Sequence, residues 1–151
     1  MSVSQEEVER RLGHFRDVCR RAAMKLTHQR LEIFRELART DEHPDAEMVY
    51  KGVRKRVPTV SLDTVYRTLW LLLDLGLITT LGFPRQRIRF DANMSSHHHF
   101  VCTRCGMVRD FHGPEFDAYT IPEAAKAYGS VERTLVEVRG LCSHCLTTKG
   151  E

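Results

Sequence analysis

Apolar residues recur every three or four positions along the first sixty residues, which is the pattern of amphipathic helices. The first stripe predicts a helix from about Glu6 to Ala23, with inward positions Val8, Leu12, Phe15, Cys19 and Ala22. Thr27 is a suitable N-cap for a second helix, whose inward positions are Leu31, Phe34 and Leu37. A third helix is predicted to begin at Asp45 and to end before Pro58, with its basic residues Lys51 to Arg56 facing outward, either as a solvated surface or as contacts to DNA phosphates.

A fourth helix is predicted to begin after Ser61, which can cap it, and to end at Gly76. Its inward positions are Val65, Leu69, Leu72 and Leu73. Thr64 and Arg67 fall on the opposite face, flanked by Tyr66. This helix therefore presents a polar face that contains an arginine and a tyrosine.

Two short β-type segments follow the fourth helix and are joined by the turn residues Gly82 to Arg85. The second segment alternates as Arg87-Ile-Arg89-Phe, which places arginines on one side of a hairpin. Short helices followed by a basic hairpin are typical of a winged helix-turn-helix, which puts one helix in the DNA major groove. The alternative is a helical bundle whose basic residues are only a solvated face.

The last third of the chain has a different pattern. Residues 114–128 predict a helix that Pro122 kinks or restarts, with apolar positions Phe116, Tyr119, Ile121, Ala124 and Tyr128. The β-branched, partly alternating stretch Val131 to Arg139 predicts a strand. A small sheet of about three strands leaves an open edge that a second copy of the chain can cover, so we expect a homodimer. The predicted fold class is α+β.

Charge divides the chain in the same way. Residues 1–90 carry 17 Lys/Arg and 12 Asp/Glu, a net charge of +5, whereas residues 91–151 carry 6 and 8, a net charge of −2. We therefore predict a DNA-binding domain over residues 1–90 and a dimerisation and metal-binding domain over residues 91–151. The composition, 42% hydrophobic and 28% charged, excludes a mostly disordered chain. No apolar run reaches membrane-spanning length and the first residues lack an apolar signal core, so we expect a cytoplasmic protein.

Two CxxC pairs, Cys102-x-x-Cys105 and Cys142-x-x-Cys145, are separated by 36 residues. Each pair brings two thiolates to one ion, and two pairs complete a tetrahedral four-cysteine zinc site. Disulfides are disfavoured in a reducing cytosol, and a redox dithiol needs only one pair. A closed four-thiolate shell leaves no position for a substrate, so the predicted Zn²⁺ is structural.

A second group of potential ligands contains His97, His98, His99, Asp91 and Asp110. On a strand, His97 and His99 point to one face and His98 to the other, so alternation selects which pair can share an ion. Imidazole and carboxylate ligands together suit Fe(II), Mn(II) or, less selectively, Zn(II). The alternative is a solvated polar loop before a strand. His112 and Glu115 are a weaker candidate for a further site.

The order of several motifs resembles the ferric uptake regulator (Fur) family of metal-responsive repressors, over most of the chain. The motifs are Lys25-Leu-Thr27-His-Gln-Arg30, His43-Pro44, Ser61-Leu-Asp-Thr-Val-Tyr-Arg-Thr-Leu69, Arg89-Phe-Asp91, His97-His-His99, Cys102-x-x-Cys105-Gly, Asp110-Phe111 and Gly140-x-Cys142-x-x-Cys145. The resemblance implies a winged helix, a dimerisation domain, structural zinc and a separate regulatory metal, Fe²⁺ or Mn²⁺. It also implies that His43 joins the ligands Asp91, His97, His99 and Asp110.

The hypothesis that follows is a repressor that binds a palindromic DNA operator when metal is present. Its expected DNA-binding residues are Lys25, Ser61, Thr64, Tyr66 and Arg67. Two aspartates among the ligands resemble the peroxide-sensing branch, in which oxidation of His43 or His97 releases the DNA. Arg67 instead resembles the iron-uptake branch. The stretch before the last strand has Arg133 and Thr134 where many relatives carry a histidine.

Two other classes of protein remain as alternatives. A metal-dependent hydrolase would need an open coordination position with a general base beside it. The sequence contains no HExxH, and the candidate carboxylates serve as ligands, so we do not expect an enzyme. A zinc-stabilised DNA-binding module without metal sensing would bind DNA equally well after mutation of His97 and His99.

Overall fold

The computed structural model describes residues 2–82, 87–118 and 120–148, and it divides into two compact units, one up to Met94 and one from Ser95. Residues 91–94 therefore belong with the first unit, although the charge pattern assigned them to the second domain. The predicted turn at Phe83–Arg85 and the predicted apolar position Tyr119 lie outside the described residues. No helix in the described part of the chain is long and apolar enough to span a bilayer.

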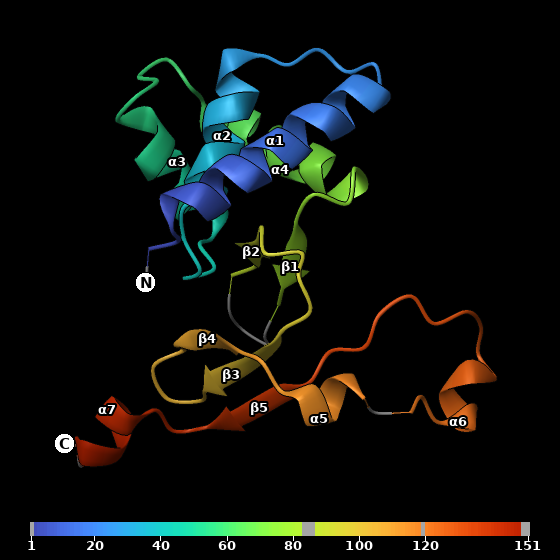
Figure 1. The fold of residues 1–151 in the computed structure, drawn as a ribbon. Helices are drawn as coiled ribbons and strands as arrows, with labels where there is room; N and C mark the ends of the chain where they lie inside the picture. Colours follow the sequence, from blue (N-terminus) through green and yellow to red (C-terminus); the bar gives the residue numbers. More distant parts are fainter. Residues whose placement is uncertain (1, 83–86, 119, 149–151) are drawn as a thin grey trace. The chain divides into compact units, whose positions relative to one another are not determined.

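The first unit consists of four helices followed by a two-stranded hairpin (Figure 1). The elements are α1 (Gln5–Arg21), α2 (His28–Ala38), α3 (Ala46–Arg54), α4 (Leu62–Asp74), β1 (Thr79–Leu81) and β2 (Arg89–Asp91). The four helices begin in the same way, because each N-cap side chain accepts a hydrogen bond from the backbone N–H three residues later. These N-caps are Ser4, Thr27, Asp45 and Ser61. The caps predicted at Thr27 and Ser61 are confirmed.

The helices enclose one apolar core. Phe15 of α1 stacks on Phe34 of α2 with ring centroids 4.6 Å apart. Cys19 is buried beside them as a small core residue, as its position on the apolar stripe predicts. Leu69 and Leu72 pack the inner face of α4 into the same core, which leaves its opposite face to solvent. The core therefore fixes which face of α4 is exposed.

The hairpin is held against the start of α3. β1 and β2 are antiparallel, with Thr80 opposite Phe90. The Phe90 N–H donates to the carbonyl of Pro44 at 3.0 Å, and Asp45 forms an isolated antiparallel bridge with Arg89. The segment before α3 thus lies alongside β2, which brings His43 next to the end of that strand.

The second unit is a three-stranded sheet with three short helices (Figure 1). Its elements are β3 (His98–Cys102), β4 (Val108–Phe111), α5 (Pro114–Asp117), α6 (Glu123–Lys126), β5 (Glu137–Gly140) and α7 (Ser143–Thr147). The strand order is β4-β3-β5, so β3 is central. β3 pairs antiparallel with β4 and parallel with β5, with His99 opposite Asp110 on one side and Glu137 on the other.

Two predictions for the second unit are wrong in extent. The helix predicted over residues 114–128 restarts after Pro122, as expected, but it is reduced to two four-residue helices. The first ends at Asp117, and the second begins at Glu123, with Pro122 at its N-cap position. Of its predicted apolar positions, Ala124 and Tyr128 are exposed within one chain. The strand predicted over Val131–Arg139 is limited to Glu137–Gly140, because its ladder partner β3 begins only at His98.

Candidate functional site

The four cysteines of the CxxC pairs converge within the second unit. Cys102 ends β3, Cys105 follows in the tight turn before β4, and Cys142 caps α7, which carries Cys145. One sulfur from each lies within 4.8 Å of all the others, and none of these cysteines forms a disulfide. Apart from the sulfurs, their small core contains only Phe100, Met107 and Leu141 among the described residues.

The spacing of these sulfurs fits a tetrahedral zinc ion. A tetrahedron with Zn–S bonds of about 2.3 Å has an S···S edge of about 3.8 Å, and the Sγ atoms of Cys105 and Cys142 are 3.8 Å apart. Backbone N–H groups also point at the sulfurs: Cys142 N lies 3.4 Å from Cys102 Sγ, and Cys145 N lies 3.4 Å from Cys142 Sγ. These donors stabilise thiolates, the form that binds metal.

The thiols of this cluster differ in acidity. Backbone N–H groups of Cys105 and Cys142 lower the pKa of Cys102 to about 5. Burial, followed by the neighbouring thiols, raises the pKa of Cys145 to about 12. Without a cation, four adjacent sulfurs cannot all ionise because the thiolates repel one another. A bound divalent ion removes that conflict, so the donor set fits structural zinc.

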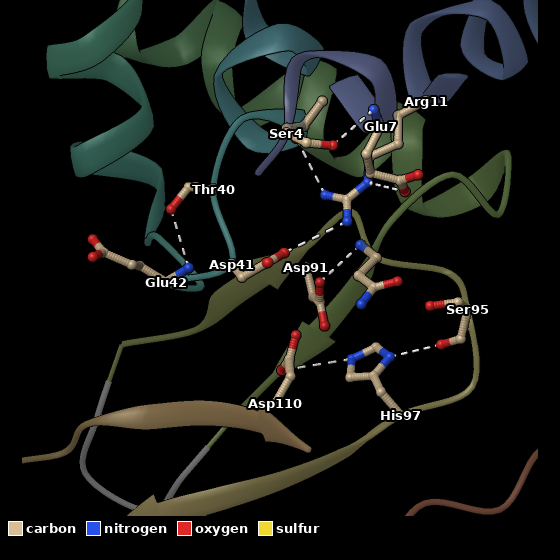
Figure 2. A network of polar contacts seen from close by, with 12 residues as sticks. Ser4, Glu7, Arg11, Thr40, Asp41, Glu42, Asp91, Ser95, His97 and Asp110 are labelled. Carbon is tan, nitrogen blue, oxygen red and sulfur yellow. Dashed lines mark hydrogen bonds and ion pairs between the residues drawn. The ribbon is translucent and has the colours of Figure 1, made fainter. Parts of the chain in front are cut away.

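The second unit also contains a cluster of two histidines and a carboxylate. His97 Nε2 and His99 Nε2 lie 3.7 and 3.3 Å from the same Asp110 Oδ1. The two imidazoles are perpendicular with centroids 4.8 Å apart, and both side chains are at most 3% exposed. Figure 2 shows His97 between Asp110 and the carbonyl of Ser95, which lies 2.6 Å from His97 Nδ1. The Nε2 atoms are therefore aimed at one carboxylate, as in a shared ion site.

The alternation expected for the histidine run is confirmed. His98 points away from Asp110, and its Nε2 lies 3.1 Å from Asp117 Oδ1. His112 is exposed, with Nδ1 3.1 Å from the carbonyl of Ser96. Within the described ranges, neither His112 nor Glu115 belongs to a group of three potential ligands. The weaker candidate site at these two residues is thus not assembled.

The first unit contributes a buried histidine and a buried carboxylate. His43 Nε2 lies 3.4 Å from Asp91 Oδ2, and their side chains are 0% and 2% exposed. His43 has a backbone φ of +55°, in the left-handed region that non-glycine residues rarely adopt. Asp91 Oδ1 accepts a hydrogen bond from the N–H of Asn93 at 2.8 Å. An imidazole and a carboxylate thus face each other in a dry environment that suits metal ligation.

Of the residues expected to bind DNA, Tyr66 and Arg67 lie on the exposed face of α4. Tyr66 is 40% exposed, and the Arg67 side chain is 80% exposed and lies 2.9 Å from Asp63. Ser61 Oγ accepts from the Thr64 N–H at 3.1 Å and donates to Thr64 Oγ1, so its hydroxyl serves the helix cap. Lys25 is exposed in the loop before α2.

Sequence reasoning did not assign a role to Arg30, although it lies in the first motif. Arg30 lines one surface depression together with Thr27, Thr64 and Arg67. Its guanidinium donates to the carbonyl of Lys25 at 2.6 Å, so it also fixes the loop that carries this lysine. The sequence feature that could have identified Arg30 is its position three residues after the N-cap Thr27, which places it on the first turn of α2.

Two arginines expected on outward or phosphate-binding surfaces are instead ion-paired. Arg56 bridges Glu32 and Glu36 of α2 at 2.6 and 2.7 Å. Arg87 of the hairpin lies 2.6 Å from Glu47 of α3. Both side chains join neighbouring elements, so their charges are largely compensated within the first unit.

The family model of the ferric uptake regulators matches residues 21–137. The peroxide-responsive repressor PerR of Staphylococcus epidermidis is 30% identical over 145 residues, which cover 96% of this chain and 97% of that protein. The Campylobacter jejuni peroxide stress regulator has a similar structure, with a TM-score of 0.67 and 28% identity over 89% of this chain and 98% of that one. A zinc-bound manganese uptake regulator has a TM-score of 0.65 and 29% identity over 84% of this chain and 97% of that one. The chain belongs to the ferric uptake regulator family.

Proposed function

We propose that the chain is a metal-dependent transcriptional repressor, in which one regulatory ion is held by His43, Asp91, His97, His99 and Asp110. The observation that supports this proposal is the division of these ligands between the units. His43 and Asp91 lie in the unit that carries α4, and His97, His99 and Asp110 lie in the other. Ligands from both units, when they share an ion, restrict the angle between the units.

The structural site is proposed to be separate and to hold Zn²⁺ on Cys102, Cys105, Cys142 and Cys145. All four ligands come from the second unit, so zinc stabilises that unit and leaves the angle between the units free. The chain acts by binding and not by turnover, because its candidate carboxylates are used as ligands. The cytoplasm, which contains the operator DNA, is the proposed compartment.

Two copies are proposed to act together on a palindromic operator. Within the second unit, apolar residues that one chain leaves exposed include Tyr128, Val131, Leu135 and Val138. A second copy can bury these residues. A dimer reads two half-sites about 34–36 Å apart, so the angle between units sets whether both α4 helices enter the major groove. Lys25, Ser61, Thr64, Tyr66 and Arg67 are the proposed contact residues, with Arg67 a candidate for bidentate contact to guanine.

Hydrogen peroxide is the signal we propose. The ligand set of two aspartates and three histidines is the feature that supports it, together with the peroxide-responsive relatives. Fe(II) held by these ligands would supply the redox chemistry that activates hydrogen peroxide. In the net reaction, one imidazole and one H2O2 give an imidazole with one added oxygen atom and one water, so peroxide itself is the oxidant. His43 and His97 are the proposed sites of oxygen addition, and an oxidised imidazole no longer binds metal well. A metal-uptake regulator is the second candidate, supported by Arg67 on α4 and by the similarity to a manganese uptake regulator.

The test is DNA binding to a palindromic operator with Fe(II) or Mn(II) titrated without oxygen, before and after a pulse of peroxide. We expect either metal to raise the affinity, roughly 5- to 150-fold for a typical coupling between two sites. Peroxide should reverse only the Fe(II) effect, with one oxygen atom added to His43 or His97 by mass spectrometry. Binding that follows metal and ignores peroxide would identify the metal-uptake candidate.

The matched variants are Asp110→Ala, which removes a proposed ligand, and Glu123→Ala, which removes an exposed carboxylate that pairs with Lys126 of the same short helix. Asp110→Ala should keep zinc and lose the metal dependence of DNA binding, whereas Glu123→Ala should keep both. Unchanged metal dependence in Asp110→Ala would contradict the proposed ligand set. If the unmodified chain binds DNA equally well without added metal, the alternative of a zinc-stabilised DNA-binding module that senses no metal is supported instead.

A further inference from the structure

His98 is a buried polar residue for which the proposed function has no use. It is 2% exposed, and it projects from β3 on the side opposite to the one where His97 and His99 meet Asp110. Its imidazole packs against Phe111 and Phe116, with ring centroids 5.6 Å away in both cases. A buried imidazole requires hydrogen-bond partners, and those of His98 come from two distant parts of the second unit.

The contacts of His98 define its tautomer. Nδ1 accepts a hydrogen bond from the backbone N–H of Val136 at 3.2 Å, so this nitrogen carries no hydrogen. In a neutral imidazole the hydrogen is then on Nε2, which donates to Asp117 Oδ1 at 3.1 Å. The same carboxylate oxygen accepts from Ser96 Oγ at 3.0 Å. Both ring nitrogens therefore form hydrogen bonds: Val136 N–H donates to His98, and His98 donates to Asp117.

The two partners of His98 stand at opposite ends of one segment, which we call the arm (residues 118–135). Asp117 ends α5 immediately before the arm, and Val136 immediately precedes β5 after it. Among the described residues from Thr120 to Leu135, every one except Ile121 is exposed. The arm therefore has little buried surface of its own, and one imidazole contacts both of its ends.

We propose that His98 is a positioning residue that fastens both ends of the arm to β3 and so transmits the state of the regulatory site to the arm. The transmission rests on the proposed function. His97 immediately precedes β3 and His99 is the second residue of this strand, so an ion that immobilises their side chains also limits the motion of β3 at His98. His98 passes this restriction to Asp117 and Val136 on the other face. The arm carries Tyr128, Val131 and Leu135, which are proposed to meet the second copy.

The backbone amide of Val136 reports on this contact directly, because its hydrogen is the one that His98 accepts. The experiment is amide hydrogen exchange on the full zinc-loaded chain, with and without Mn(II), read at Val136. The test variant is Asp117→Ala, which removes the acceptor for His98 Nε2–H. The matched variant is Asp117→Asn, which keeps an acceptor oxygen at the same place. The Asp117 side chain is 43% exposed, so neither substitution disrupts a core.

In Asp117→Ala we expect Val136 to exchange on the order of tenfold faster than in the unmodified chain, the effect of one hydrogen bond to a charged group. Mn(II) should slow Val136 exchange in the unmodified chain and in Asp117→Asn, but not in Asp117→Ala. A residue that only adds stability would speed exchange equally with and without Mn(II), and that result would overturn the transmission. Equal exchange in all three chains would overturn the contact itself.

Two further measurements make the outcome unambiguous. Nuclear magnetic resonance of the imidazole nitrogens should find the hydrogen of His98 on Nε2. A hydrogen on Nδ1 would refute the proposed hydrogen bonds from Val136 to His98 and from His98 to Asp117. Operator binding by the same samples separates the two proposals. The unmodified chain could bind DNA without metal while Asp117→Ala still speeds hydrogen exchange at Val136. In that case the proposed regulatory function is wrong, but the attachment of the arm through His98 is supported.

Discussion

His43 combines a strained backbone with a fully buried side chain. Its φ of +55° costs a non-glycine residue about 1 kcal/mol or more. The hydrogen bond from Phe90 N–H to the Pro44 carbonyl holds the next residue in place and so maintains the conformation. The strain directs the imidazole toward Asp91. The protein thus accepts a local cost in backbone conformational energy at a proposed ligand position, and the side chain of His43 points at Asp91.

This geometry distinguishes two substitutions that remove the same imidazole. His43→Gly should be more stable than His43→Ala by about 1 kcal/mol, because only glycine adopts a positive φ without cost. Both variants should lose metal-dependent operator binding. Urea unfolding of the zinc-loaded chain without regulatory metal measures the difference in free energy of unfolding. If the alanine variant is as stable as the glycine variant, the backbone at residue 43 is not strained.

At the scale of elements, α1 is fastened to α2 through a buried arginine. The Arg11 side chain is 6% exposed, donates to the carbonyl of Ala38 at 3.2 Å, and lies 2.9 Å from Glu7 (Figure 2). The hydrogen bond from Arg10, with that from Arg11, lowers the pKa of Glu7 to about 2 against the burial that raises it. The ionised carboxylate of Glu7 therefore helps to keep α1 on the bundle.

Glu7→Gln should remove a pH-dependent part of this stability. Because the pKa of Glu7 is lower in the folded chain, its contribution is complete above about pH 4.5 and is lost as pH falls toward 2. We expect the variant to be about 1–2 kcal/mol less stable at pH 7, since the exposed Arg10 pair is screened by solvent. Denaturant unfolding of both chains from pH 7 to pH 3 measures the difference. A difference that stays constant over this range would contradict the assignment.

The helices of the first unit were predictable from the sequence, because their apolar faces pack against one another within one chain. The predicted inward positions of α1, α2 and α4 are buried or partly buried except Ala22, which lies at the C-cap of α1 and is exposed. The caps at Thr27 and Ser61 marked two helix starts, because these signals are local. The second unit was less predictable, since the pairing partner β3 limits β5. The restart after Pro122 was visible in the sequence, but the end of α5 at Asp117 was not. Helix α7 was missed because a cysteine caps it. The pairs of Arg56 and Arg87 were missed because they arise from packing between helices and the hairpin.

At the scale of the whole molecule, the two units differ in what stabilises them. The first unit has an apolar core built from all four helices and the hairpin. The second has a sulfur cluster with three partly buried apolar neighbours among the described residues. We therefore expect the free energy of unfolding of the second unit to depend on metal binding at the proposed zinc site, which contributes about 10–16 kcal/mol in zinc-finger peptides.

Removal of zinc should consequently unfold one unit and spare the other. With a strong chelator, we expect amides of β3 and β5 to lose protection against hydrogen exchange, while those of α1 and α4 keep it. The helical circular dichroism should fall only slightly, because the long helices are in the first unit. Cys145→Ser, which lacks one thiolate, should behave like the chelated chain, and Cys19→Ser serves as a control for loss of a thiol outside the cluster. Loss of protection in both units together would show that zinc supports the whole chain.

The parallel pairing of β3 with β5 affects how the protein is made. The second strand of this pair and the second CxxC lie far along the chain from the first, so the sheet and its zinc site close only after Cys145 has been synthesised. The first unit contains its own core and can fold earlier on the ribosome, as amino-terminal domains generally do. For a short period we therefore expect the nascent chain to have a folded first unit, with His43 and Asp91, before the unit that carries His97, His99 and Asp110 has folded. In a cell starved of zinc, we expect this period to lengthen and uncontrolled chains to accumulate until proteases remove them.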